Sequence, residues 1–495
     1  METRERRITL RRRIGKDEER SYLEVPFVVD GRAERIEAAY RYERGGGEAV
    51  VDIGLRSPER IVGWSGGARQ SFFVGTELAT PGYLAGPVAE GEWAVLLGAY
   101  KIPAEGTEVT IDIVLSAPRG GWIKGDLHMH GVHSDGRYTI EAAKASCASR
   151  GLSYMALTDH NTLSQNRAAL APDERLLVLP GVELTSYFGH ANVYGAPEAL
   201  RDFRVTTPEQ ARATLGEIRA QGGFVSLNHP FCPSCPWELG FDLPYDAIEV
   251  WNGPWRALNE RAVAWWQEQL AAGRRLIALG GSDAHAEDRL VKHGRPTAAV
   301  RTDEATAQSV LDGIRQGRVV LSFDPDETFL TLTSGDYGAG DLLPRAALDG
   351  AGAIPLVIDV EGARGDRVAL WSDRGLEAAW DIEAAADAPA KAWEADAAAG
   401  GWAVQRELAA LREHAAPGGA DRATASATAS AAAAAEVPAT RVPAAEAADG
   451  RVRLRFEGAA DRLFYRLEAR RTAAGTGVSV MTCLTNPLYI ERAAE

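Results

Sequence analysis

Asp126-Leu127-His128-Met129-His130 ends an apolar run with two histidines in alternate positions. Alternate residues of a strand share one face, so His128 and His130 can point at the same ion. Comparable elements follow at Ser134-Asp135-Gly136, Thr158-Asp159-His160-Asn161, Gly181-Val182-Glu183, Gly189-His190, Asn228-His229-Pro230 and Ser282-Asp283-Ala284-His285. Six of the nine histidines of the chain lie in these elements. The pattern indicates a metal centre assembled from several strand ends.

From Trp122 onward, short apolar strands alternate with helices. Thr139 is a candidate cap for a helix that stops at Gly151 and precedes a buried strand at 154–157. Further helices are predicted over 208–221 and about 258–272, each followed by a short apolar strand. This order predicts an α/β fold of the β/α-barrel kind, in which each strand presents its ligand at its C-terminal end.

The flanking segments have the alternating pattern of β-strands, as in residues 108–115 and 451–456. An Ala-rich, low-complexity stretch interrupts the second of them, and we expect no catalytic residue there. The predicted organisation is a charged N-terminal segment at 1–20, a β-sandwich-like domain at 21–118, a metallohydrolase barrel at 119–325, a C-terminal β-rich domain at 326–383 and 450–495, and the insertion at 384–449.

Composition restricts the partners. The chain of 495 residues has a formal charge of −15, which disfavours a nucleic-acid partner. It has no apolar run long enough to span a membrane and opens without a secretory signal, so we expect a cytoplasmic protein. A homo-oligomer is left open. The pair Cys232-Pro-Ser-Cys235 is more typical of a rigid loop near His229 than of a zinc or redox motif.

The candidate ligands are nine side chains, namely His128, His130, Asp135, His160, Glu183, His190, His229, Asp283 and His285. One ion cannot use nine ligands, so two or three divalent ions are implied. Imidazole mixed with carboxylate suits Mn, Zn or Fe. Two or three such ions among three carboxylates leave a positive excess, which favours a small anionic substrate.

Three assignments stay open at this level. His160 is favoured as a ligand over its neighbour Asp159, which is the better candidate for an orienting or turn-capping role. Asp135 competes with His133 and is favoured because Ser134-Asp135-Gly136 makes a tight turn. His190 could instead belong to an edge strand.

Together these motifs resemble the PHP (polymerase and histidinol phosphatase) superfamily of metallohydrolases across about residues 121–323. The segments Gly189–Gly195, Ile248–Asn252 and Gly294–Val300, with Asn486–Ile490, are similar to the carbaryl-hydrolase-type (CehA/McbA) branch. The resemblance implies a distorted seven-stranded β/α barrel with β-rich domains on both sides. It also implies three sets of ligands: His128, His130, Glu183 and Asp283; a bridging Glu183 with His190 and His229; and Asp135, His160 and His285.

The function expected from these residues is a metal-dependent hydrolase, first of all a phosphoesterase that cleaves a small phosphate ester through a metal-activated hydroxide. Glu183 and Asp283 are expected in the catalytic centre. Arg295 is expected to bind the substrate anion, with Arg256, Arg289 and Lys292 as weaker candidates. The alternatives are a carboxylic-ester, carbamate or amide hydrolase with the same metal site, and a non-catalytic binding protein.

Overall fold

The computed structural model describes residues 5–44, 49–117, 120–169, 176–348, 352–363, 365–384, 438–443, 451–472 and 479–492. These residues form two compact units, one extending to Gly121 and the other comprising most of residues 122–495. The predicted insertion at 384–449 lies outside the described residues except for residue 384 and residues 438–443. No helix among the residues described is both long and apolar enough to cross a membrane.

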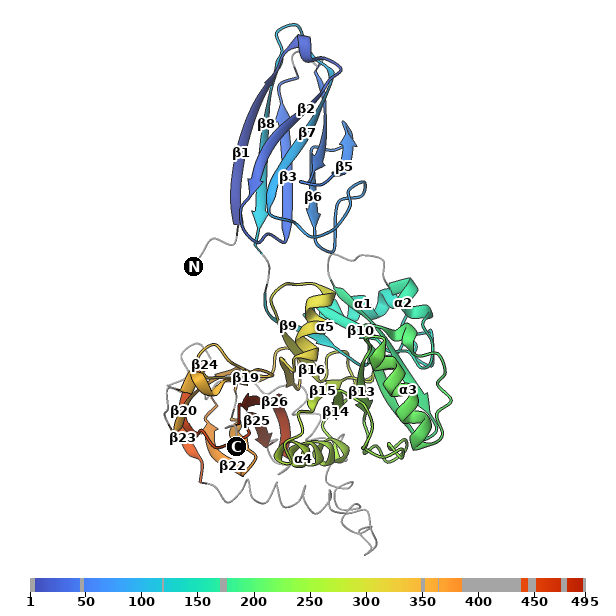
Figure 1. Cartoon of the computed structure of the whole chain (residues 1–495), viewed down its shortest axis with the longest axis vertical. Coiled ribbons are helices and arrows are strands. Elements are labelled where there is room, and N and C mark those ends of the chain that lie inside the picture. The colour runs from blue at the N-terminus through green and yellow to red at the C-terminus, as the bar shows by residue number, and fades with distance from the viewer. Residues whose placement is uncertain are drawn as a thin grey trace, which may run out of the picture. The chain divides into compact units, whose positions relative to one another are not determined.

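The N-terminal unit consists of two four-stranded antiparallel sheets (Figure 1). Buried residues that alternate along the strands, such as Ile53 and Ile111, form one shared apolar core. One sheet has the order β1 (Glu5–Ile14), β8 (Thr107–Ser116), β3 (Arg35–Tyr42), β6 (Ser71–Gly75), and the other β2 (Tyr22–Val29), β7 (Gly91–Lys101), β4 (Val50–Arg56), β5 (Ile61–Gly66).

The charged segment expected at residues 1–20 is not separate from the sandwich. Its residues Glu5–Ile14 form β1, which pairs along its whole length with β8. The alternation of Ile8, Leu10 and Ile14 with exposed arginines places the apolar side chains on the inner side. The high charge belongs to the solvent-facing side of an edge strand, where it discourages further pairing.

The second unit begins with alternating strands and helices (Figure 1). In chain order they are β9 (Gly121–Asp126), α1 (Ile140–Ser149), β10 (Tyr154–Leu157), α2 (Ser164–Ala169), β11 (Leu177–Ser186), β12 (Gly189–Tyr194), α3 (Pro208–Ala220), β13 (Phe224–Asn228), β14 (Ala247–Asn252), α4 (Ala257–Ala271), β15 (Ile277–Gly281), β16 (Thr297–Thr302), α5 (Ala307–Arg315) and β17 (Val319–Ser322).

The helix boundaries follow local capping chemistry. Before α1, Oγ1 of Thr139 accepts a hydrogen bond from the Ala142 amide (3.2 Å), and the chain turns at Gly151 with φ +74°. Before α3, Oγ1 of Thr207 accepts a bond from the Gln210 amide (3.3 Å). The three predicted helices are therefore confirmed within one or two residues.

The sheet of this unit is mixed. Its order from β15 runs β15-β14-β13-β12-β11-β10-β9-β16-β17 and continues into the C-terminal strands. β12 is antiparallel to both β11 and β13, because a short turn at Tyr187 folds it back on β11. The expectation of a β/α repeat with a ligand at every C-terminal strand end is thus wrong for two residues. Glu183 lies within β11, and His190 lies at the start of β12.

The segments that follow β9 and β15 are hydrogen bonded to each other. The His130 amide donates to the Ala284 carbonyl (3.0 Å), and the Asp283 amide donates to the His128 carbonyl (2.8 Å). These bonds bring the first and last ligand motifs of the chain together. A closed seven-stranded barrel stays a prediction.

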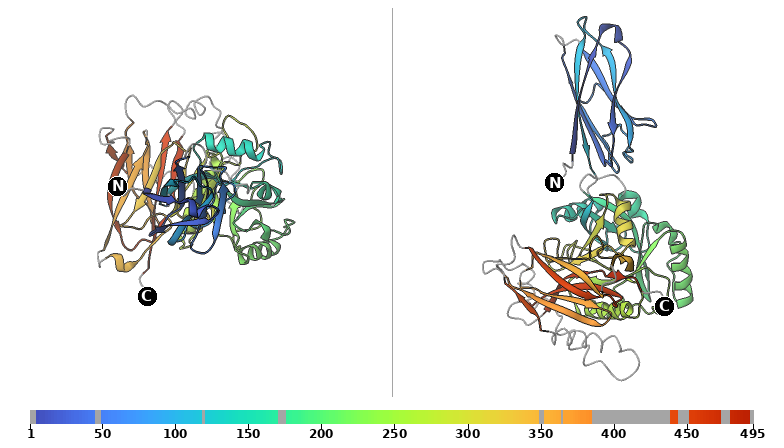
Figure 2. Two further views of the ribbon diagram at one scale, coloured as in Figure 1. Left: turned by 90° about the horizontal axis from the view of Figure 1, so that it is seen from above. Right: turned by 60° about the vertical axis from the view of Figure 1, so that its left-hand side comes forward.

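The C-terminal strands extend the same sheet through the pairing of β17 with β26 (Ser479–Thr485), and a three-stranded sheet lies beside them (Figure 2). The other strands of this part are β18 (Phe329–Thr333), β19 (Leu342–Leu343), β20 (Ala353–Glu361), β21 (Arg367–Ser372), β22 (Gly375–Ile382), β23 (Thr440–Val442), β24 (Arg451–Ala459), β25 (Phe464–Thr472) and β27 (Leu488–Ile490).

The polar contacts that attach these strands to the part that carries the ligands include those of Asn486 and Arg470. The Asn486 side chain accepts a bond from the Ala278 amide (2.8 Å) and donates to the carbonyls of Ala278 (2.9 Å) and Val319 (3.1 Å). Arg470 on β25 donates to both carboxylate oxygens of Glu260 on α4 (2.8 and 2.9 Å). Both contacts satisfy polar groups that burial would otherwise penalise.

Candidate metal centre

All nine predicted ligands lie in one cluster, and Glu183 is at its centre. Its Oε1 is 3.4 Å from Nε2 of His128, 3.3 Å from Nδ1 of His190 and 3.6 Å from Nε2 of His229. Its Oε2 is 3.5 Å from Nε2 of His130 and 2.8 Å from Nδ1 of His160. The fully buried carboxylate therefore contacts five imidazoles.

Asp283 forms a second point of convergence. Its Oδ1 lies 3.4 Å from Nε2 of His128, 3.0 Å from Nε2 of His130 and 3.7 Å from Nδ1 of His285. The rings of His128 and His130 are 5.2 Å apart, as expected for alternate positions of an extended chain.

Asp135 and His285 complete the more exposed end of the cluster. Oδ1 of Asp135 is 3.5 Å from Nε2 of His160 and 3.4 Å from Nε2 of His285. His133, the alternative to Asp135, lies outside the cluster, and its Nδ1 is 2.8 Å from Oγ of Ser164. The structure therefore groups Asp135, and not His133, with the other candidate ligands.

Three turns of the site have left-handed backbone at residues other than glycine, namely Asn161 (φ +55°), His229 (φ +28°) and Asp283 (φ +52°). Such backbone is costly for most residues and persists where surrounding contacts hold it. The Asn161 amide donates to the Glu183 carbonyl (2.9 Å), and the His229 amide donates to Oε2 of Glu249 (2.9 Å). Hydrogen bonds within the site itself thus stabilise these turns.

Sequence reasoning missed the carboxylate that orients His128. Glu249 is buried on β14, and its Oε1 lies 2.9 Å from Nδ1 of His128. Its Oε2 accepts bonds from the His229 amide (2.9 Å) and from Nδ2 of Asn252 (3.2 Å). A carboxylate behind a histidine selects the tautomer and leaves the other ring nitrogen for a metal. The available signal was an acid within the apolar run 248–251.

Two further orienting groups were missed. Nδ2 of Asn228 donates to Oε1 of Glu183 (2.7 Å), and Oγ1 of Thr185 lies 2.5 Å from Nδ1 of His160. Both fix ligands by direct contact.

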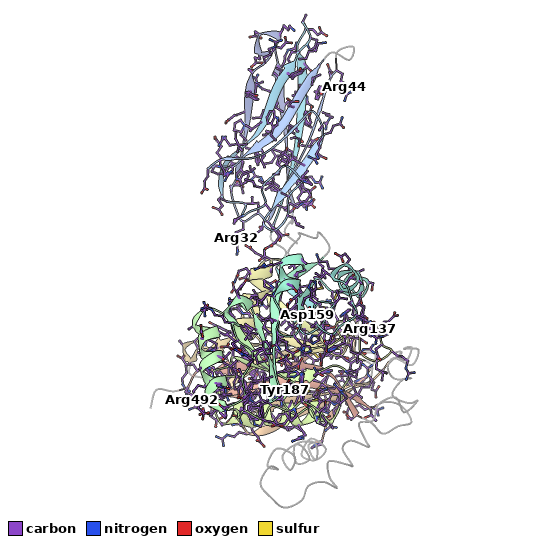
Figure 3. All side chains as sticks on the ribbon, turned by 90° about the vertical axis from the view of Figure 1, so that its right-hand side faces the viewer. Arg32, Arg44, Arg137, Asp159, Tyr187 and Arg492 are labelled. Carbon is purple, nitrogen blue, oxygen red and sulfur yellow. The ribbon has the colours of Figure 1, made fainter. Side chains whose placement is uncertain are left out.

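Asp159 has the capping role that its position favours. Its Oδ1 accepts bonds from the Gly131 amide (3.0 Å) and from Oγ of Ser134 (2.8 Å), which holds the turn that carries Asp135. Asp159 and Tyr187, the exposed tip of the β11–β12 turn, are labelled in Figure 3.

The structure does not bring Arg295 into the cluster. Its guanidinium is buried, pairs with Asp324 through two nitrogens and donates to the Leu290 carbonyl (3.3 Å). Among the described residues, its polar contacts include none of the nine candidate ligands. Arg256 is closer to the site, because its Nη2 donates to Oδ1 of Asn252 (2.9 Å), whose Nδ2 contacts Oδ2 of Asp283 (3.3 Å).

The buried imidazoles and carboxylates of the site shift one another's pKa values. Burial lowers the pKa of His128, but the surrounding carboxylates, Glu249 first, outweigh burial and raise its pKa well above its usual range. Burial lowers the pKa of His130. Burial also raises the pKa of Glu183, but the imidazoles, His128 first, outweigh it and hold its pKa well below the usual range. Glu183 is therefore ionised, as a metal ligand must be.

The donor set fits divalent cations. Nε2 of His128, Nε2 of His130, Oε2 of Glu183 and Nδ1 of His190 are buried without a hydrogen-bond partner. Buried polar atoms are normally satisfied, so several unsatisfied atoms that converge on one point require a further partner. Among the described residues, five sets of ligand atoms are close enough to share an ion: His130, Asp135, His160 and His285; His128, His130 and Asp283; His128, Glu183 and His229; His160, Glu183 and His190; and His190, His229 and Cys235.

No family model matches the chain. A segment of 92 residues, 18% of this chain, is 37% identical to the DNA polymerase/3'-5' exonuclease PolX of Bacillus subtilis. The chain spans only 16% of the length of that relative. Over 150 residues the chain is 28% identical to the uncharacterized protein MJ1587 of Methanocaldococcus jannaschii, covering 26% of this chain and 82% of the relative.

Two solved structures are similar to parts of the chain. A two-domain protein of Bacteroides vulgatus that contains a predicted PHP-like metal-dependent phosphoesterase is 18% identical with a TM-score of 0.33, covering 51% of this chain and 79% of that one. The lesion-specific endonuclease PfuEndoQ of Pyrococcus furiosus is 16% identical with a TM-score of 0.32, covering 44% and 63%.

Proposed function

We propose that the protein is a metal-dependent hydrolase, and specifically a phosphoesterase that acts on small phosphate esters. The observation that carries the proposal is the position of Glu183, a buried carboxylate within 3.6 Å of five imidazole nitrogens. Ligands that converge from seven separate segments of the chain are expensive to bury, and ions would satisfy them together.

We propose the division of the ligands that the sequence resemblance implies. His128, His130, Glu183 and Asp283 would hold one ion, Glu183 with His190 and His229 a second, and Asp135 with His160 and His285 a third. Divalent ions bound there would supply an acidified water molecule and neutralise charge on the attacked group. Mn, Zn and Fe all suit this mixture of nitrogen and oxygen ligands.

The charge of the site favours three ions over two. Glu249 adds a fourth carboxylate to Asp135, Glu183 and Asp283, of which Glu183 is buried and Asp135 is exposed. Two divalent ions would only balance four carboxylates, whereas three leave an excess of two positive charges. An excess of positive charge is what attracts and holds a phosphate.

The residues around the ions orient the metal ligands and bind the substrate. Glu249 keeps Nδ1 of His128 engaged, so that Nε2 faces the cluster, and Asn228 restrains Glu183. Arg256, held beside Asp283 through Asn252, is our candidate to bind the substrate's anionic group, because its guanidinium can donate two parallel hydrogen bonds to phosphate oxygens.

Phosphoryl transfer is supported by one sequence relative. The relative that is 37% identical over 92 residues is named as an exonuclease, an activity that hydrolyses phosphodiester bonds. We propose hydrolysis of a phosphate ester here as well, but on a small substrate, since the formal charge of −15 opposes a polynucleotide. A closed barrel formed by β9 to β15 is part of the proposal.

One panel of substrates tests the proposal. Full-length protein loaded with Mn²⁺, Zn²⁺ or Fe²⁺ is assayed on p-nitrophenyl phosphate, bis-p-nitrophenyl phosphate and p-nitrophenyl acetate, with elemental analysis of the same samples. We expect phosphate-ester cleavage that requires metal. Cleavage of the acetate alone would support the carboxylic-ester, carbamate or amide hydrolase instead. Full metal loading without any cleavage would support a binding protein.

His133→Ala and His285→Ala are a matched pair for this assay. His133 lies in the same region of sequence as the ligands but contacts Ser164, whereas His285 contacts Asp135 and Asp283. We expect loss of activity in His285→Ala and near-normal activity in His133→Ala. Equal activity of the two variants would contradict the proposed site.

A further inference from the structure

Cys232 and Cys235 lie beside a metal ligand, in the loop between β13 and β14. Their Sγ atoms are 3.2 Å apart, and Sγ of Cys235 is 3.7 Å from Nδ1 of His229. Both thiols are free and partly exposed to solvent. The other two cysteines, Cys147 and Cys483, are fully buried.

We propose that Cys232 and Cys235 form a reversible disulfide whose formation weakens metal binding at His229. The inference rests on the proposed function in one respect, namely that His229 is a metal ligand. The formation of the disulfide itself depends only on the two thiols.

The geometry of the reduced pair is close to that of the oxidised one. A disulfide requires its sulfurs about 2.05 Å apart, so each sulfur has to move by well under about 1 Å. With hydrogen peroxide as oxidant, the two thiols give up two protons and two electrons, one S–S bond forms, and the peroxide O–O bond breaks to yield two water molecules. With a small disulfide as oxidant, thiolate exchange through a mixed disulfide releases two small thiols.

The coupling to the metal centre runs through the ring of His229. Its Nε2 lies 3.6 Å from Oε1 of Glu183, on the side of the cluster, and its Nδ1 faces the sulfur of Cys235. A histidine that binds a metal through Nε2 carries its proton on Nδ1, and the partner of that proton fixes the ring. Cys235 therefore occupies the place that a carboxylate or carbonyl fills in most metal sites.

The loop gives the sulfur little freedom to satisfy both partners. The Cys232 amide donates to the His229 carbonyl (2.8 Å), and the Trp237 amide donates to the Pro230 carbonyl (3.0 Å), so both ends of the loop are anchored. Trp237 packs against Gly189, where an added Cβ would lie 2.5 Å from its ring, directly before His190. Because the loop is anchored, oxidation acts on the contact itself: the thiol of Cys235 becomes a disulfide sulfur, which is a poorer hydrogen-bond partner for Nδ1 of His229.

The test measures the disulfide and the metal separately. The full chain is equilibrated in a series of glutathione buffers, from fully reduced to fully oxidised glutathione. Peptide mass mapping without reduction reports the Cys232–Cys235 bond. After removal of glutathione, Mn²⁺ affinity is measured calorimetrically on the reduced and the oxidised chain. We expect the bond to form and the Mn²⁺ affinity to fall by at least about tenfold, the usual effect of losing a partner behind a ligand.

Two variants separate the parts of the proposal. Cys232→Ser cannot form the bond but keeps Cys235 beside His229, so its Mn²⁺ affinity should match the reduced chain in every buffer. Cys235→Ala should bind Mn²⁺ as weakly as the oxidised chain even when reduced.

Each contrary outcome overturns either this inference or the proposed function. Absence of the disulfide at every potential, or equal Mn²⁺ affinity of the reduced and oxidised chains, overturns this inference and leaves the proposed function intact. If the reduced chain binds no Mn²⁺, Zn²⁺ or Fe²⁺ at all, the proposed function fails and the coupling fails with it, while the disulfide is still judged by mass.

Discussion

Oε1 of Glu249 lies 2.9 Å from Nδ1 of His128, and this contact determines which nitrogen of the imidazole faces the cluster. The same carboxylate accepts a hydrogen bond from the His229 amide. Glu249 therefore connects two ligands on different strands without belonging to the ligand set.

Replacing Glu249 is expected to weaken metal binding. Glu249→Ala removes the partner of His128, and Glu249→Gln places an amide nitrogen against a donor, since both oxygens of Glu249 accept bonds. We expect Mn²⁺ affinity to fall by about 10–100-fold, measured calorimetrically. Glu108→Gln, on the exposed side of β8, is the control and should bind normally. Unchanged affinity in both Glu249 variants would mean that His128 is oriented by other groups.

Glu183→Ala is expected to remove at least one equivalent of bound metal. No other carboxylate among the described residues contacts five imidazoles, so neighbouring ligands cannot replace it. Elemental analysis of the purified variant, with His133→Ala prepared in parallel, gives the result. A metal content equal to that of the unaltered protein would refute the bridging role of Glu183.

Gly281→Ala is expected to displace His128. A Cβ at Gly281 would lie 2.3 Å from Cβ of His128 and 2.6 Å from its backbone nitrogen, which are atoms that cannot rotate away. We expect the free energy of unfolding in urea to fall by about 1–3 kcal/mol, and the bound metal to decrease. Gly352→Ala, with open space around the added methyl group, serves as control. Equal stability of the two variants would show that the strands separate freely there.

Acid is expected to destabilise the second unit through Glu468. Burial raises the pKa of this carboxyl, but Arg466 and Arg470 outweigh it and lower the pKa below its ordinary value of 4.5. A lowered pKa in the folded state gives stability that is present at neutral pH and lost as pH falls through that pKa. Glu468→Gln should therefore lower the free energy of unfolding at pH 7 by about 3 kcal/mol and flatten its dependence on acid. Urea titrations at several pH values, with Glu108→Gln beside them, provide the measurement.

Arg256→Gln is expected to affect substrate binding more than metal binding. If Arg256 binds the anionic group, KM for p-nitrophenyl phosphate should rise by about tenfold or more, because the variant loses the charge-assisted hydrogen bonds of the guanidinium, while metal content stays constant. Arg295→Gln should instead lower stability, because it leaves Asp324 buried without one of its partners. A rise of KM only in Arg295→Gln would reverse the two assignments.

The candidate ligands were accessible from the sequence because their chemistry is local. Alternation places His128 and His130 on one face, and the turn at Ser134-Asp135-Gly136 favours Asp135 over His133. The helices were accessible for the same reason, since Thr139 and Gly151 mark the two ends of α1. Each of these inferences uses only residues that are close neighbours in the sequence.

Pairing between distant segments could not be predicted from the sequence. The reversal of β12 depends on the turn at Tyr187, and a period of two is the same in parallel and antiparallel strands. Glu249 lies 121 positions from His128, so its role depends on how β14 is placed. Arg295 appeared to be a substrate-binding residue until its buried partner Asp324 was known.

The side-chain amide of Asn486 makes the two hydrogen bonds with the backbone of Ala278 that a neighbouring strand would make. Ala278 lies in β15, the strand that leads to Asp283. It comes 208 positions before Asn486 in the chain, so a ribosome releases the ligand segment long before the residue that secures it. A fragment limited to the ligand-bearing segment would lack the hydrogen bonds between Asn486 and Ala278. We therefore expect the isolated ligand-bearing segment to retain metal less well than the full chain.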